Sequence, residues 1–169
     1  MKIRTFLCGA IFLVALLMIR SVKSRKGYGF STSILLKKRQ CYQQRPFLTE
    51  RERVFFRQLC AAFSGSPLLV MALVRLVDVV QVSPGIKGRE KLSLFRQISQ
   101  WHCDFVVIDA RNFSVKAIIE LDDRSHLRPE RQHRDALFNI VVTQAGIPLH
   151  RPRSVKQAGD VAANILRSA

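Results

Sequence analysis

Three carboxylates in the second half of the chain have the types and the spacing of a metal site. Asp104 opens the apolar run Asp-Phe-Val-Val-Ile-Asp, and Glu120 and Asp122 lie near the end of a second run, Ala-Ile-Ile-Glu-Leu-Asp. Both runs are rich in β-branched residues and are bounded by turn residues, which predicts two strands joined as a hairpin through residues 111–114. Because strand side chains alternate, Glu120 and Asp122 are expected on one face, where Asp104 can approach them. The pattern predicts a site for a hard divalent cation at the sheet edge.

Three strings carry a resemblance to a known family: Cys-Asp-Phe-Val-Val-Ile-Asp, Ile-Ile-Glu-Leu-Asp-Asp-Arg-Ser-His-Leu-Arg-Pro-Glu-Arg-Gln-His-Arg-Asp-Ala and Ala-Gly-Ile-Pro-Leu. They resemble a bacterial domain family of unassigned function, grouped with the PD-(D/E)XK nucleases near the very-short-patch mismatch-repair endonucleases. The likeness extends from about residue 49 to residue 151. It implies an α/β fold with a restriction-endonuclease-like core, in which helices flank a central mixed sheet, and metal-dependent cleavage of phosphodiester bonds. By matching position, Asp104 is the first metal carboxylate and Glu120 the second, whereas Asp122 replaces the usual lysine.

Phosphodiester hydrolysis at such a site needs Mg²⁺ or Mn²⁺, which lowers the pKa of a bound water and offsets charge on the phosphate. Asp104, Glu120 and the backbone carbonyl of Leu121 would suit Mg²⁺. Asp122 could then be a third ligand or a base toward the bound water. The alternative is that Asp104 and Glu120 are strand-end charges paired with arginines. A carboxylate that follows Ala-Ile-Ile needs a metal or a cation to offset its desolvation, which favours the site.

Glu52 has two possible roles. Thr49-x-x-Glu52 is a capping box, and apolar residues at helical spacing follow it. The resemblance adds a second role, because related nucleases place a glutamate from the first helix beside the metal. Both roles are compatible only if the cap lies against the site.

The helix after the hairpin brings further candidates. His126 could protonate the leaving oxygen or contact the scissile phosphate, or it could cap the helix that follows. Asp135 could orient the site, as the resemblance suggests, or form an ion pair with Arg131 four residues earlier. Charge-assisted hydrogen bonds to phosphate are expected from four arginines: Arg124, Arg128, Arg131 and Arg134.

The basic charge lies mainly at the N-terminus. The formal net charge is +16, and residues 1–48 hold ten Lys and Arg and no Asp or Glu. This balance predicts a polyanionic partner, either nucleic acid or anionic lipid, and DNA is the more consistent with the resemblance. The four cysteines lack the spacing of a zinc site.

Residues 6–19 form an unbroken apolar run with basic residues on both sides. The run is shorter than the ~20 residues that cross a bilayer core, but flanking Lys and Arg can extend it by reaching the interface. We expect an uncleaved anchor in the bacterial inner membrane at residues 1–26, then a basic linker at 27–46 and a cytoplasmic nuclease-like domain at 47–169. A cleaved export signal is the alternative.

The rest of the pattern alternates helices and strands. Helices are expected over residues 47–63, 92–101, 129–146 and 154–168, and strands at the start of 68–82 and over 147–150. A basic loop is expected at 87–91. The helix at 129–146 is expected to bury Leu137, Ile140, Val141 and Ala145. The sequence therefore favours a membrane-tethered, Mg²⁺-dependent nuclease acting on DNA. A catalytically weak module of the same fold that binds nucleic acid or anionic lipid is the alternative.

Overall fold

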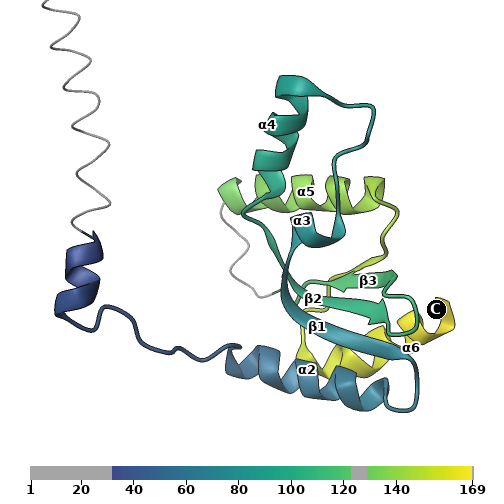
Figure 1. Cartoon of the computed structure of the whole chain (residues 1–169). Helices are drawn as coiled ribbons and strands as arrows, with labels where there is room; N and C mark the ends of the chain where they lie inside the picture. The colour runs from purple at the N-terminus through teal and green to yellow at the C-terminus, as the bar shows by residue number, and fades with distance from the viewer. Residues whose placement is uncertain (1–31, 123–128, 169) are drawn as a thin grey trace, which may run out of the picture. The chain divides into compact units, whose positions relative to one another are not determined.

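The computed structural model describes residues 32–122 and 129–168 (Figure 1). The chain divides into Met1–Pro46 and a compact unit, Phe47–Ala169. In the first part, residues 32–38 are helical and 39–46 are largely irregular. The expected anchor at residues 6–19 lies outside the described residues. Of the helices that are described, none is both long and apolar enough to span a bilayer.

A four-stranded mixed sheet forms the centre of the compact unit. Its strands run in the order β1 (Leu68–Arg75), β2 (His102–Asp109), β3 (Val115–Ile119) and β4 (Leu149–His150). The first three are antiparallel neighbours, whereas β4 pairs parallel to β3. Helices cover both faces, so the expected α/β fold with a mixed sheet flanked by helices is confirmed.

Each face of the sheet has its own core. On one face, Phe105, Val107 and Ile119 pack with α2 (Glu50–Ala62) and α6 (Ala158–Ser168). On the other, Val106 and Ile118 pack with α3 (Leu76–Val79) and α5 (Pro129–Gln144). Figure 1 shows α2 and α6 on one side of the strands and α3 and α5 on the opposite side. The alternation of strand side chains explains why neighbouring residues of β2 enter different cores.

Local signals place most of these elements correctly. The capping box at Thr49 starts α2, and a second capping box at Ser154 starts a short 3₁₀ turn, Val155–Gln157, before α6. Gly146, with φ +70°, follows the end of α5 as expected of a helix C-terminus.

Two expectations about helices were wrong in part. Of the stripe expected on α5, Leu137 and Val141 are half-buried against the core, but Ile140 is 51% exposed and Ala145 is exposed, and the buried residues are Phe138 and Val142. Apolar residues occupy so much of the circumference of α5 that the sheet, not the local pattern, selects the buried face. The helix expected at 92–101 is α4 (Gly88–Ile98), so Arg89 and Lys91 of the expected loop are helical and only Lys87 precedes the helix. No side chain caps the start of α4, so the sequence lacks the N-cap residue from which the first residue of the helix could be predicted.

Candidate metal and phosphate site

Asp104 and Glu120 meet where β2 begins and β3 ends. The pairing of Phe105 with Ile119 continues outward to place Asp104 opposite Glu120. The backbone N–H of Asp104 donates to Glu120 Oε1 over 3.2 Å, and the N–H of Leu121 donates to Asp104 Oδ2 over 2.7 Å. Each carboxylate is therefore fixed by the backbone of the opposite segment. The two expected metal carboxylates lie side by side.

Burial and mutual repulsion make this pair costly to ionise. Burial, and then the negative charge of Asp104, raise the pKa of Glu120 to about 8, against the smaller effects of the Asp104 N–H and Arg151. Burial also raises the pKa of Asp104, which the Leu121 N–H opposes. Within residues 32–122 and 129–168, no Lys, Arg or His side chain hydrogen-bonds to either carboxylate. A divalent cation bound by both would relieve the repulsion.

The strand on the other side of Asp104 is distorted. In the β1–β2 register, Ala72 pairs with Phe105 and Val74 with Cys103, which places Leu73 opposite Asp104. Leu73 has φ 53°, in the left-handed region that a side chain makes unfavourable. The surrounding core holds Leu73 in place. Such strain is concentrated at functional sites in proteins.

Glu52 forms the expected cap and also acts on the pair. Its Oε2 accepts from the N–H and the hydroxyl of Thr49, both over 2.7 Å. The charge of Glu52 is also one of the causes that raise the pKa of Asp104. The cap therefore lies close enough to the carboxylates for both roles to be compatible. A role for Glu52 in metal binding stays a prediction.

Asp122 does not continue the strand face of Glu120. The strand β3 ends at Ile119, and the N–H of Asp122 donates to the carbonyl of Glu120 over 3.1 Å, a three-residue turn. The expectation that strand alternation aligns Glu120 and Asp122 was therefore wrong. Instead, Asp122 Oδ1 forms an ion pair with Arg151 Nη1 over 2.9 Å, and both side chains are about one-fifth exposed.

Among the residues that the structure describes, Arg151 is a cation that acts on both carboxylates, and the sequence patterns did not single it out. Its Nε donates to Asn139 Oδ1 over 3.0 Å, and its guanidinium lies 5.7 Å from the centre of the Phe138 ring. Its charge lowers the pKa of both Asp104 and Glu120. Arg151 directly follows β4, and parallel strands end at the same sheet edge. Predicting that β4 pairs parallel to β3 would therefore have placed Arg151 near the carboxylates.

Arg51 is a second cation that local patterns did not single out. Its guanidinium donates to the carbonyls of Leu121 (3.3 Å), Asp122 (2.6 Å) and Arg153 (2.9 Å). It therefore ties the start of α2 to the segments that follow β3 and β4. The Leu121 carbonyl, expected as a metal ligand, already accepts this bond, although a carbonyl oxygen has a second lone pair.

For the remaining candidate residues, on α5 and in the segment before it, the structure describes no contact with Asp104 or Glu120. Arg134 is exposed on α5, and Asp135 is half-buried there. Arg131 belongs to α5, but its side chain lies outside the described part, as do Arg124, His126 and Arg128 entirely. Their roles stay predictions.

The donor set suits Mg²⁺ better than a metal that needs a full protein cage. In the described ranges, no three His, Cys, Asp or Glu side chains are arranged to hold a metal ion. Mg²⁺ is typically held by one or two carboxylates and completes its shell with water and substrate phosphate. Two adjacent carboxylates with raised pKa values therefore fit it. The neighbouring Cys103 is not a ready ligand, because burial and then Glu120 and Asp104 raise its pKa to about 12.

Comparisons with known proteins identify a family but no activity. No curated protein and no solved structure matches the chain. One family profile, described as "Protein of unknown function (DUF2726)", matches residues 44–168, which include the whole sheet and both carboxylates. Since that match covers most of the sequence, the chain belongs to the DUF2726 family.

Proposed function

We propose that this protein hydrolyses phosphodiester bonds of DNA with a bound Mg²⁺ or Mn²⁺, through a restriction-endonuclease-like core. The observation that carries the proposal is the Asp104–Glu120 pair. Two partly buried carboxylates at a sheet edge are fixed by backbone N–H groups, Glu120 by that of Asp104 and Asp104 by that of Leu121, and their pKa values are raised. Without a metal, a buried pair of carboxylates of this kind would oppose folding. A metal site, in contrast, requires two adjacent carboxylates.

The chemistry divides between the metal and the side chains. When bound, the metal would supply a nucleophilic hydroxide near neutral pH and offset charge on the phosphate. Asp104 and Glu120 would hold it. Arg151 takes over the positive charge that relatives obtain from a lysine at the position of Asp122, and Asp122 orients Arg151 through their ion pair. Arginine suits this task because its guanidinium can donate to a carboxylate and a phosphate together.

A catalytically weak module of the same fold is the second candidate, binding nucleic acid or anionic lipid. The observation that favours it is the ion pair itself, because Asp122 is engaged with Arg151 and is not free to act as a base. In either case we propose that residues 6–19 tether the domain to the bacterial inner membrane.

Plasmid cleavage separates the two candidates. The full chain in non-ionic detergent should convert supercoiled plasmid to nicked or linear forms with Mg²⁺ or Mn²⁺ and not with EDTA. Asp104→Asn and Glu120→Gln should abolish cleavage, whereas the control Asp160→Asn, an acid-to-amide change at an exposed residue of α6, should not. Binding of DNA without cleavage under all metal conditions would favour the module.

A further inference from the structure

Helix α4 is joined to the rest of the compact unit through little apolar contact. Of its residues only Ile98 is buried, while Leu92, Leu94 and Phe95 are 46%, 42% and 47% exposed. In Figure 1, α4 projects from the side of the sheet that α3 and α5 cover. A helix with this many large exposed apolar side chains normally has a partner.

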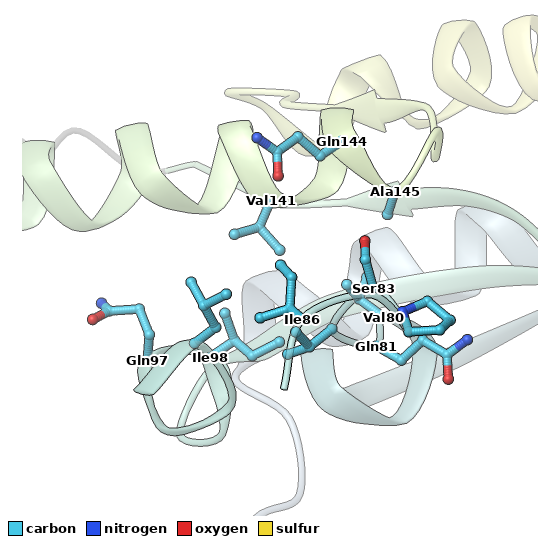
Figure 2. A pocket seen from close by; sticks show the side chains of 12 residues that line it. Val80, Gln81, Ser83, Ile86, Gln97, Ile98, Val141, Gln144 and Ala145 are labelled. Carbon is cyan, nitrogen blue, oxygen red and sulfur yellow. The ribbon is translucent and has the colours of Figure 1, made fainter. Parts of the chain in front are cut away.

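Apolar hollows lie on both flanks of α4. One, of about 300 Å³, lies between α4, the segment 80–86 and the end of α5, and Ile86 and Val141 face each other across it (Figure 2). A second, of about 390 Å³, is bordered by Leu92 and Phe95. Both share Ile98. Except for Ile98, the apolar side chains of α4 (Leu92, Leu94 and Phe95) therefore border these hollows instead of a packed core.

The same helix is cationic. Lys87, Arg89, Lys91 and Arg96 oppose the single acid Glu90, so the segment 87–98 carries four positive charges minus one, or +3. In the part of the chain that the structure describes, none of these four cations is paired with a carboxylate. Arg89 and Arg96 lie seven residues apart and so share one side of the helix with Leu92. Lys91, Phe95 and Ile98, at spacings of four, three and seven, share the adjacent side of the helix.

We propose that α4 is a docking surface for an anionic lipid bilayer. A cationic helix with exposed Leu and Phe is the composition that lies in a membrane interface, with apolar side chains in the acyl boundary and Lys and Arg at the headgroups. DNA would engage the cations but leave the apolar side chains exposed. A second copy docking α4 on α4 would bring two segments of +3 together, which repel. The proposal does not depend on the proposed hydrolysis.

The test places a fluorescent reporter on α4 in the full chain. Phe95→Trp adds a tryptophan to the buried Trp101, and vesicles carry brominated acyl chains, which quench tryptophan on contact with the acyl region. We expect quenching and a blue shift of the new emission with phosphatidylglycerol–phosphatidylcholine vesicles and not with phosphatidylcholine alone. The parent protein corrects for Trp101. Because the reporter is on α4, insertion of residues 6–19 alone does not produce the signal.

Charge variants make the test specific. Arg89→Gln with Arg96→Gln should lower the docked-to-free ratio about 25-fold, since each cation near an anionic surface is worth roughly fivefold. The matched control, Arg57→Gln with Lys156→Gln, removes two exposed cations elsewhere and should leave quenching unchanged. Leu92→Trp is the second reporter if Phe95→Trp lowers the melting temperature. Absence of quenching from both reporters, equal quenching with neutral lipid, or protection of the reporter by duplex DNA instead would overturn the proposal.

Discussion

Replacing Glu120 by glutamine should make the metal-free protein more stable at alkaline pH. The pKa of Glu120 is raised from 4.5 to about 8 by burial and by Asp104. The folded state therefore binds a proton more tightly than the unfolded state. Between pH 4.5 and pH 8 the carboxyl contributes stability that is lost as the pH rises, and above pH 8 the full cost of ionisation remains. Glutamine keeps the shape and removes that cost.

The size of the effect follows from the shift. One pKa unit corresponds to ~1.36 kcal/mol, so the upper limit is about 5 kcal/mol, and relaxation reduces this to about 2–4 kcal/mol. We expect Glu120→Gln to exceed the parent in free energy of unfolding by that amount at pH 8.5 and to match it near pH 4.5. The readout is the difference between the two proteins, because burial lowers the pKa of His150, which favours the fold as pH rises.

Metal provides the second arm of this experiment. Mn²⁺ at about 100 times its dissociation constant should add ~2.7 kcal/mol to the parent at pH 8.5 and nothing to Glu120→Gln. Asp160→Asn serves as the control for a simple loss of negative charge. The reasoning fails if Glu120→Gln is less stable than the parent at pH 8.5, because the carboxylate would then be held by a cation. It also fails if Mn²⁺ stabilises both proteins equally.

Three further outcomes are expected. Glu52→Gln keeps a group that can complete the capping box, so the melting temperature should change little, and a loss of Mn²⁺ affinity or cleavage would assign Glu52 to the metal. Arg151→Gln should cost about 1–3 kcal/mol in denaturant unfolding, and adding Asp122→Asn should restore part of it, whereas additive losses would contradict their coupling. Full-length protein should stay with membranes through high-salt and alkaline extraction and should not after deletion of residues 6–19. Recovery of the intact chain in the supernatant would count against the anchor.

The carboxylate pair could be predicted because it depends on local pattern. Two β-branched runs and a short polar turn set the hairpin, and the hairpin register sets Asp104 opposite Glu120. Nothing local specifies the partner of Asp122. Arg151 reaches it only because β4 pairs parallel to β3 after the chain has crossed over through α5. Arg51 likewise contacts carbonyls about 70 and 100 residues away.

The parallel pairing of β4 with β3 also sets an order of assembly. About 30 residues separate Ile119 from Leu149, so joining these strands requires closure of a long loop, whereas the β2–β3 hairpin closes locally. A chain made from its N-terminus can therefore form the hairpin before Arg151 exists. Asp104 and Glu120 then meet without Arg151 nearby, and their repulsion opposes the hairpin until Arg151 or a divalent ion arrives. Folding should be faster in Mg²⁺, and substitutions in β4 should accelerate unfolding more than they slow refolding.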